Sequence, residues 1–345
     1  MATFNSTIQG SDTGDTLIGT EADQLILGGS AGDSIGSQYA RSCLVGAAGN
    51  DSFFASSAVP GIGTGTTLTG NSGADSFDFG TYGLTDVVLY GNQDNDTVRL
   101  TGPILNSSLY GGQGEDSLQL RDTVFLSRVE ANSGNDTINI AASVGAGFVH
   151  GGQGDDRVSV TGTVSGSFFS GGSGADLLSF TNAVNVSTVE GGSGSANDTL
   201  LFAGTVSDSN LTFSSGNDSI SLGRGLTNGT VIAGSGADTL NISFAALNSS
   251  LQGGDGADFI SVSGSLSATT VTGASGADTI TVNGNIVDSE LFGNQDDDRI
   301  LVSGNATNSG LYGGQGNDVL SISGNAVGGN VEGNSGADTI TVAGT

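Results

Sequence analysis

The stretch that decides the fold is Gly313-Gly314-Gln315-Gly316-Asn317-Asp318, a six-residue turn motif that recurs along the chain. Close copies read GGQGED up to Asp116, GGQGDD up to Asp156 and GGDGAD up to Asp258. Including looser copies, the last residue of the motif forms one register of seventeen aspartates: Asp15, Asp33, Asp51, Asp75, Asp96, Asp116, Asp136, Asp156, Asp176, Asp198, Asp218, Asp238, Asp258, Asp278, Asp298, Asp318 and Asp338. From Asp96 onward, eleven of the twelve spacings are 20 residues and one is 22. A period of this size predicts a solenoid in which each copy starts a new turn.

Apolar columns support the same register. Leu118 and Leu120 stand two and four residues after Asp116, Leu109 stands seven residues before it, and the equivalent positions of the following turns are also apolar. Alternation of this kind predicts short strands with one face inward, and successive turns would stack as parallel strands about 4.8 Å apart. We therefore expect an all-β fold, a flattened and right-handed parallel β-solenoid (β-roll or β-helix) of about 17 turns with two strands in each turn.

The spacing of the motif also predicts how the chain is organised. The 345 residues are expected to form a single continuous solenoid, with 18-residue turns over 1–50, irregular turns over 51–95 and regular 20-residue turns over 96–345. Pro60 falls in the longest step, so a loop is expected near 58–65. The 61 glycines and 2 prolines agree with many tight turns between short strands.

Three successive nine-residue units, GSDTGDTLI, GTEADQLIL and GGSAGDSIG, fill residues 10–36. They resemble the nonapeptides G-G-x-G-x-D-x-U-x, with U apolar, of the RTX or haemolysin-type calcium-binding family. The resemblance implies Ca²⁺ ions between adjacent turns, each held by an Asp from both turns and by carbonyls of the Gly-x-Gly segments. After Asp96 the opposite corner of each turn, as at Gly162-Thr163 or Gly304-Asn305, has no acids. This departure leaves open whether that corner binds anything.

The chemistry of the stacked carboxylates favours the same metal. Carboxylates about 4.8 Å apart repel one another unless a cation, a proton or a hydrogen bond compensates them. Ca²⁺ takes six to eight oxygen ligands, and glycine turns expose carbonyls beside the carboxylates. All seventeen aspartates of the register are therefore predicted metal ligands, and their sixteen gaps allow up to about 16 ions in one row. The alternative is that each Asp only caps its turn by a hydrogen bond to the backbone.

Composition restricts the partners and the location. The net charge of −28 does not suit nucleic acid, whose binding needs a basic surface. Cys43 is the only cysteine and has no partner for an internal disulfide. No apolar run reaches the ~18 residues of a transmembrane helix, and the first residues, MATFNSTIQGSDTG, lack the features of a Sec signal. The family resemblance implies type I secretion, hence an extracellular or cell-surface protein with a cell-surface polysaccharide as a candidate partner.

Catalysis is not expected, and no catalytic residue or cofactor other than Ca²⁺ is predicted. His150 is the only histidine and falls in an outward-facing column, which leaves no zinc site and no Cys/His pair. A polysaccharide-acting β-helix enzyme would use clustered carboxylates, and the candidates are Asp296-Asp297-Asp298 and Asp155-Asp156. These acids lie in the repeated corner, where they would strengthen calcium sites.

Ice or surface adhesion is a third function class that the sequence raises. Rows of threonine can form flat surfaces on a solenoid, and the positions that hint at such rows are Thr279, Thr281, Thr339 and Thr341. Serine and leucine interrupt both columns, so ordinary solvent-facing strand residues are the favoured interpretation.

Both ends of the sequence suggest assembly. Ile8 stands seven residues before Asp15, as Leu311 does before Asp318, and Thr345 follows Asp338 by seven residues. Joining two copies head to tail would space Asp338 and Asp15 of the next copy by 22 residues, a step that the chain already uses. The half-turn at Ile8 would then complete the turn after Thr345, which predicts a homopolymer, a structural filament or surface layer. The rival is a calcium-binding RTX repeat region of a larger type I-secreted adhesin, toxin or hydrolase.

Overall fold

The computed structural model describes residues 4–37, 39–55 and 64–344, and the regular elements in these ranges are β-strands. By its internal contacts the chain divides into two compact units, Met1–Gly172 and Ser173–Thr345. Among the described residues there is no helix of the length and apolar character needed to cross a membrane.

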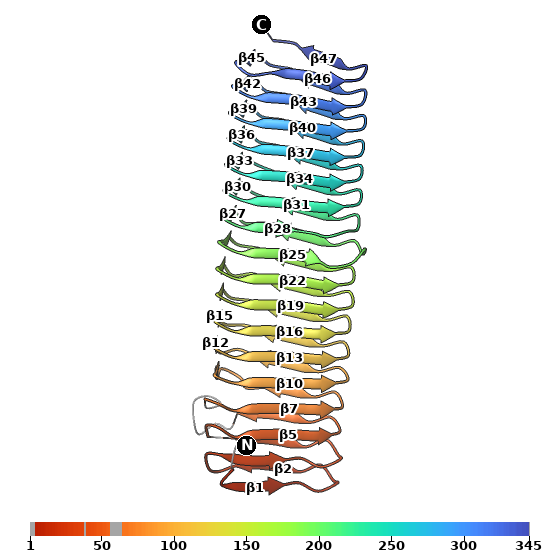
Figure 1. The fold of residues 1–345 in the computed structure, drawn as a ribbon. Coiled ribbons are helices and arrows are strands. Elements are labelled where there is room, and N and C mark those ends of the chain that lie inside the picture. Colours follow the sequence, from red (N-terminus) through yellow and green to blue (C-terminus); the bar gives the residue numbers. More distant parts are fainter. Residues whose placement is uncertain (1–3, 38, 56–63, 345) are drawn as a thin grey trace. The chain divides into compact units, whose positions relative to one another are not determined.

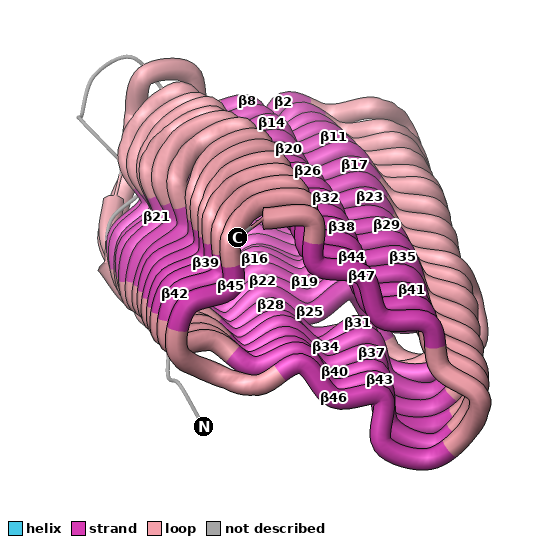
Figure 2. Tube along the Cα trace, turned by 90° about the horizontal axis from the view of Figure 1, so that it is seen from above, coloured by secondary structure: helices cyan, strands magenta, loops and turns pink. Residues whose placement is uncertain are grey.

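Each unit is a stack of parallel turns, so the predicted parallel β-solenoid is confirmed (Figure 1). Viewed along the stack, the strands of a unit gather on separate faces (Figure 2). Sheet A holds the strand that leads into each Gly/Asp corner, and sheet B holds the strand that leaves it. Sheet C holds a two-residue strand on the far side of the turn.

The strands of the first unit belong to these three sheets. Sheet A contains β1 (Ser6–Gln9), β3 (Gln24–Leu27), β5 (Cys43–Ala48), β7 (Thr67–Ser72), β10 (Val88–Gln93), β13 (Ser108–Gln113), β16 (Arg128–Ser133) and β19 (Phe148–Gln153). Sheet B contains β2 (Thr16–Gly19), β4 (Ser34–Ser37), β6 (Ser52–Ala55), β8 (Ser76–Asp78), β11 (Thr97–Leu100), β14 (Ser117–Leu120), β17 (Thr137–Ile140) and β20 (Arg157–Val160). Sheet C contains β9 (Leu84–Thr85), β12 (Ile104–Leu105), β15 (Val124–Phe125), β18 (Val144–Gly145) and β21 (Val164–Ser165). Strand β22 (Phe168–Ser173) reaches the boundary of the units.

The second unit repeats the arrangement. Sheet A contains β25 (Thr188–Gly192), β28 (Asn210–Thr212), β31 (Thr230–Ser235), β34 (Ser250–Asp255), β37 (Thr270–Ser275), β40 (Glu290–Gln295), β43 (Gly310–Gln315) and β46 (Val331–Ser335). Sheet B contains β23 (Leu177–Phe180), β26 (Thr199–Phe202), β29 (Ser219–Leu222), β32 (Thr239–Ile242), β35 (Phe259–Val262), β38 (Thr279–Val282), β41 (Arg299–Val302), β44 (Val319–Ile322) and β47 (Thr339–Val342). Sheet C contains β24 (Val184–Asn185), β27 (Val206–Ser207), β30 (Leu226–Thr227), β33 (Ala246–Leu247), β36 (Leu266–Ser267), β39 (Ile286–Val287), β42 (Ala306–Thr307) and β45 (Ala326–Val327).

The pairing register follows the spacing of the aspartates. Strands β2 and β4 pair with a shift of 18 residues, β6 and β8 with a shift of 24, and β14 and β17 with a shift of 20. Equivalent positions of successive turns therefore lie directly above one another. Residues 58–63 of the predicted loop lie outside the described residues, and the chain is back in register at Thr67, which pairs with Cys43.

Three of the columns that fill the core were predicted. Leu118, Leu120 and Leu109 have no exposed surface, and their equivalents in the other regular turns are also buried, except in the last turn. The expected two strands per turn hold for the 18-residue turns at the start of the chain. The 20-residue turns add the short strand of sheet C, which the sequence analysis did not include.

The strand of sheet C carries a fourth core column. It lies eight residues after each Asp, as at Ile104, Val124 and Leu226, and these side chains are fully buried. The column was visible in the sequence as one apolar residue per period. Because each strand of sheet C is only two residues long, it lacks the alternation that marks the other strands.

The corner after sheet C is tight and uses left-handed backbone. Asp208, Asn228, Asn248 and Asn308 have φ between 48° and 51° there, and amide or carboxylate groups link successive turns, as where Nδ2 of Asn228 donates to Oδ1 of Asp208 at 3.0 Å. This corner after sheet C is thus held by side-chain ladders. Val186 occupies the same position with φ of 50° and is 62% exposed, although a β-branched residue is strained in this conformation.

Replacing Val186 by asparagine should therefore stabilise the second unit. The left-handed conformation costs most L-residues about 1–2 kcal/mol and costs asparagine less, and the new amide group would also face Asp208. We expect V186N to raise the midpoint of thermal unfolding in calcium, and the reverse change N228V to lower it. A midpoint for V186N at or below that of the wild type would contradict this.

Candidate metal centre

The predicted aspartates line the inside of the Gly/Asp corner. The fifteen from Asp33 to Asp318 are buried, with 1–5% of their surface exposed. Asp15 and Asp338, which belong to the first and last turns, are half-buried. Each Asp immediately precedes a strand of sheet B, and the strand's apolar column fixes the residue against the core. The structure thus brings the aspartates of each unit into one internal column.

One carboxylate oxygen of each Asp links two turns. The backbone N–H of Asp96 donates to Oδ1 of Asp116 at 2.7 Å, and that of Asp258 donates to Oδ1 of Asp278 at 2.8 Å. The same bond joins the other described neighbours within each unit, at 2.6–3.0 Å. Oδ1 therefore does what the capping alternative predicted, but it caps the neighbouring turn.

The other oxygen, Oδ2, is buried without a hydrogen-bond partner in most of the column. Among the described residues this holds for Asp51, Asp75, Asp96, Asp116, Asp136, Asp218, Asp238, Asp258, Asp278, Asp298 and Asp318. A buried polar atom without a partner is costly, and a charged one is much more so. The column therefore needs a ligand that is itself positive or can donate a proton.

The first turns show how Oδ2 is satisfied when the backbone allows it. The N–H groups of Ser11 and Gly29 each donate to Oδ2 of the Asp four residues later, Asp15 and Asp33, at 2.6 Å. In most of the later turns the residue four before the Asp lies within sheet A and adopts positive φ, as Gly112 does at 131°. Its N–H no longer reaches the carboxylate, and Oδ2 is left for another partner.

Glycine five residues before the Asp keeps the space beside Oδ2 clear. A Cβ on Gly91 would lie 2.1 Å from Oδ2 of Asp96 and 2.3 Å from the carbonyl oxygen of Gly111 in the next turn. A Cβ on Gly293 would lie 2.2 Å from Oδ2 of Asp298 and 2.6 Å from the carbonyl oxygen of Gly313. A carboxylate oxygen and a carbonyl oxygen from adjacent turns thus face the same small space, which glycine leaves open.

The fold satisfies a different buried polar column completely by itself. Ser107 and Ser127 are buried and immediately precede strands of sheet A. The hydroxyl of Ser127 accepts from the N–H of Ser107 at 3.1 Å and donates to the carbonyl of Phe125 at 2.8 Å. Ser289 and Ser309 repeat this bond in the second unit. Buried side-chain oxygens without a partner are therefore concentrated at the Gly/Asp corner; outside it, among the described residues, Oε2 of Glu290 shares this property.

Burial raises the pKa of most of these carboxyls, as expected for buried carboxylates without a positive partner. Loss of hydration raises the pKa of Asp96 to about 8, and the hydrogen bond from Asp75 only partly opposes this. The same cause raises the pKa of Asp258 and Asp298 to about 7. Asp15 behaves oppositely: the backbone hydrogen bond from Ser11 holds its pKa below the ordinary value.

The donor set fits Ca²⁺. No group of three His, Cys, Asp or Glu side chains converges anywhere in the described ranges, which does not suit zinc. What converges is one carboxylate from each turn and backbone carbonyls, an all-oxygen set that a hard cation prefers. Bound between turns, the ion would neutralise the carboxylates and supply the partner that Oδ2 lacks.

Comparisons with known proteins agree with this site. The RTX calcium-binding nonapeptide repeat family (4 copies) matches residues 248–264, which include the corner at Asp258. The chain carries RTX calcium-binding repeats. Such repeats are typical of extracellular proteins that leave the cell by type I secretion. No curated protein is similar enough in sequence to match.

Two solved structures are similar to this chain. One is a hyperactive, Ca²⁺-dependent, β-helical antifreeze protein from an Antarctic bacterium, with 20% identity, a TM-score of 0.47, and coverage of 95% of this chain and 84% of the other. The second is a TibA fragment hyper-glycosylated by TibC, with 15% identity, a TM-score of 0.35, and coverage of 96% and 99%. Both scores are below 0.5, so neither structure contributes to the functional inference.

The acids considered for catalysis are engaged in the corner. Oδ2 of Asp296 accepts from the N–H of Gly276 at 3.2 Å, and Oδ1 of Asp297 accepts from the N–H of Asn317 at 2.6 Å. Asp155 likewise donates its N–H to Asn135 at 2.8 Å. His150 lies in the outward column of sheet A beside Glu130, as predicted, with its ring parallel to that of Phe148. The absence of catalysis stays a prediction.

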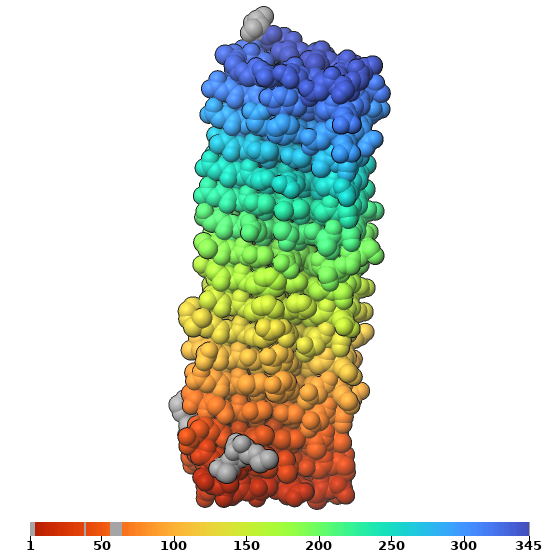
Figure 3. All heavy atoms as spheres, in the orientation of Figure 1, coloured from red at the N-terminus to blue at the C-terminus, as the bar shows by residue number. Residues whose placement is uncertain are grey.

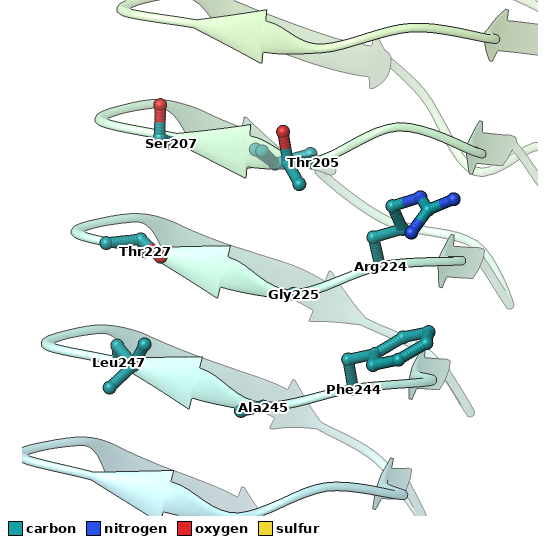
Figure 4. Close-up of a pocket in the computed structure, with 9 residues that line it drawn as sticks. Thr205, Ser207, Arg224, Gly225, Thr227, Phe244, Ala245 and Leu247 are labelled. Carbon is teal, nitrogen blue, oxygen red and sulfur yellow. The ribbon is translucent and has the colours of Figure 1, made fainter.

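A surface groove in the second unit is a separate feature (Figure 4). Arg224 and Phe244 project from successive turns, and Thr205, Thr227 and Leu247 also line the groove. Phe244 is 54% exposed. The groove is open and lies outside the Gly/Asp corner, so it plays no part in the metal site.

The raised pKa values predict that the calcium-free protein is more stable in mild acid. A carboxyl whose folded-state pKa lies near 7, above an unfolded value of about 3.9, contributes stability below the unfolded value and loses it as pH rises through about 6–8. We expect the melting temperature of calcium-free protein, followed by circular dichroism, to fall from pH 5 to pH 8. Added calcium should reverse the trend, because it needs the ionised form. A calcium-free melting temperature that rises with pH would contradict this.

A single-site variant tests the column directly. D258N keeps an oxygen that can accept the N–H of Asp238 but removes the charge beside the glycine cradle. We expect it to bind one or two fewer Ca²⁺ ions, counted by equilibrium dialysis with elemental analysis, since each Asp borders two gaps. The control is D255N, an exposed carboxylate three residues earlier that bonds to Ser275. Equal ion counts for D258N and the wild type would exclude Asp258 as a ligand.

Proposed function

We propose that this protein is an extracellular structural protein whose Gly/Asp corners bind a row of Ca²⁺ ions and whose copies join end to end into a filament or surface layer. The observation that supports calcium most strongly is the set of buried Oδ2 atoms without partners. Export by type I secretion is part of the proposal and rests on the kind of repeat present. Calcium would then be available outside the cell at the time of folding.

Calcium binding should be coupled to folding. The chain carries 35 acidic and 7 basic residues, and the described residues contain two salt bridges, Arg41–Asp23 and Arg128–Glu130. Stacking the turns concentrates this charge, while a thin core has little apolar surface to offset the repulsion. Ions between the turns would remove the repulsion only in the folded state, so their binding free energy becomes folding free energy.

End-to-end assembly is supported by the last turn of the second unit, dark blue in Figure 3. Ile340 and Val342 are 45% and 40% exposed, whereas their equivalents Leu320 and Ile322 are fully buried. Strand β47 pairs with β44 on one side only, and its residues Thr-Ile-Thr-Val include no charge or proline to protect the edge. An apolar, unprotected strand edge of this kind pairs readily with another strand.

The first turn of the first unit offers a matching edge. Strand β1 pairs with β3 through Ser6–Gln9, and no other strand pairing of β1 occurs among the described residues. Its sequence, Ser-Thr-Ile-Gln, is also uncharged. A second copy would place its β1 turn on the exposed turn of β47. The rival is that further turns of a longer RTX protein cover this surface, with an adhesin, toxin or hydrolase domain elsewhere.

The cell-surface polysaccharide stays a predicted partner. Among the described surfaces, the groove at Arg224 and Phe244 has the chemistry most suited to an acidic sugar, because an exposed aromatic ring lies beside a guanidinium group. The threonine rows that include Thr279 and Thr341 are interrupted, so we do not propose surface adhesion in place of polysaccharide binding.

Assembly can be tested with a charge at the exposed end. Ile340→Lys places an ammonium group in the column that the next copy would bury, and Thr341→Lys places it on the outward face of the same strand. With millimolar calcium we expect filaments of the wild type and of T341K by electron microscopy, and separate particles for I340K. Removal of calcium by EDTA should dissolve the filaments.

Other outcomes distinguish the two parts of the proposal. Wild-type protein that remains monomeric at high protein and calcium concentration, while its melting temperature rises with calcium, would overturn assembly and favour the larger RTX protein. A strand-rich circular dichroism spectrum in EDTA that calcium changes in neither shape nor melting temperature would overturn calcium-coupled folding.

A further inference from the structure

We infer that Phe213 closes one calcium position, the gap between Asp198 and Asp218, and so interrupts the row of ions within the second unit. The inference rests on the proposed calcium function. It concerns a place where this chain departs from its own repeat, and it predicts a local absence of metal inside a region that otherwise binds it.

Position 213 is a glycine position in most other turns. The corner reads Phe213-Ser214-Ser215-Gly216-Asn217-Asp218, so Phe213 stands five residues before its Asp. Gly253, Gly273 and Gly293 hold this position before Asp258, Asp278 and Asp298. In those turns a Cβ on the glycine would lie 2.1–2.3 Å from the carboxylate Oδ2. The space beside the carboxylate is therefore open in regular turns.

The ring of Phe213 reaches into the corresponding space beside Gly191 of the preceding turn. A Cβ on Gly191, in the preceding turn, would lie 2.2 Å from both Cδ1 and Cε1 of Phe213 and 3.1 Å from Cβ of Asp198. Phe213 is only 7% exposed, so the ring is packed inside the corner. An aromatic ring supplies no oxygen ligand and excludes the ion from the volume that it fills.

A methyl group at this position has a smaller effect. Ala131 and Ala233 replace the glycine before Asp136 and Asp238, and in both turns Oδ2 of the Asp remains buried without a partner. Those corners keep the property that calls for a cation. Only the phenyl ring is large enough to replace the cation with apolar contact, and Asp198, which it adjoins, is the most exposed of the buried aspartates at 5%.

The backbone around Phe213 is also irregular. Strand β28 pairs with β25 and with β31 through three residues each, Asn210–Thr212, whereas β34 and β37 pair through five. The chain returns to the ladder only by an isolated bridge between Ser215 and Ser235. The 22-residue step from Asp176 to Asp198 immediately precedes this point. Two departures from the repeat thus coincide at the corner that holds the ring.

The consequence is a separate block of sites after the interruption. The seven aspartates from Asp218 to Asp338 enclose six successive gaps, and the residue five before each Asp from Asp238 to Asp338 is glycine, or alanine at Ala233. Ions in this block share carboxylates with their neighbours, but they share none across Phe213. The block should therefore take up calcium as one cooperative group, independent of the corners before Asp198.

Hydrogen exchange of the wild-type chain tests the inference without any substitution. Adding calcium to calcium-free protein should slow exchange about tenfold or more in corners such as 253–258 and 273–278, where ions bridge the turns. Calcium-induced folding slows exchange throughout the unit, and this general slowing is the reference. Beyond it, exchange at 191–194 and 213–216 should slow by less than about twofold. Equal additional protection at Phe213 and at Gly253 would overturn the inference.

Ion counting on variants gives the second measurement. F213G restores the glycine and should bind one more Ca²⁺ per chain than the wild type, and the matched control F259G, which removes an exposed ring outside the corner, should bind the same number. No additional ion in folded F213G would overturn the inference. If F213G does not fold, the hydrogen-exchange result decides. If the proposed calcium binding itself is wrong, the result differs from both of these: the wild type would bind no calcium and would show no protection in any corner.

Discussion

The structure depends on one unsatisfied atom that recurs in turn after turn, the Oδ2 oxygen of a buried aspartate. Its partner oxygen Oδ1 is held by the N–H of the neighbouring turn, which fixes the carboxylate in the corner and prevents it from turning to solvent. Glycine five residues earlier keeps the adjoining space clear and brings a carbonyl oxygen to it. A protein that buries such an oxygen needs a proton or a cation beside it. The raised pKa values of Asp96 and Asp258 express the same requirement.

Because the turns stack in register, the need for a proton or cation beside Oδ2 recurs along the whole column of aspartates. Equivalent residues lie directly above one another, so any favourable or unfavourable contact is repeated at every turn. Apolar columns, the buried serine ladder and stacked rings such as Phe180 and Phe202, 4.9 Å apart, gain from the repetition. Stacked carboxylates are destabilised by the same repetition, because each repels its neighbours in the adjacent turns. The fold is stable only if the unfavourable column is neutralised, which gives calcium its place in both folding and function.

Much of the fold followed from the sequence because the period of the aspartates sets the register of everything else. The core columns at Leu109, Leu118 and Leu120 and the stacking of Asp116 with the other aspartates of the register were predicted, since each repeats at a fixed offset, whereas the burial of the aspartates was not. Sheet C was missed because its strands are two residues long, although its apolar column at Ile104 and Val124 was present in the sequence. For the aspartates, backbone capping and metal binding were treated as alternatives, while the structure gives Oδ1 one role and leaves Oδ2 for the other. That division could not be predicted, because it depends on the positive φ of residues such as Gly112. The departure at Phe213 was visible as a broken motif, but the direction of its ring came only from the structure.

The most direct test of the account is a crystal structure of the calcium-loaded protein with anomalous diffraction data that locate the metal. The account predicts anomalous peaks between successive turns of the Gly/Asp corner, each within coordination distance of Oδ2 atoms such as those of Asp258, Asp278 and Asp298 and of glycine carbonyls. Clear density for these carboxylates with no anomalous peak beside them, in crystals grown with millimolar calcium, would contradict it.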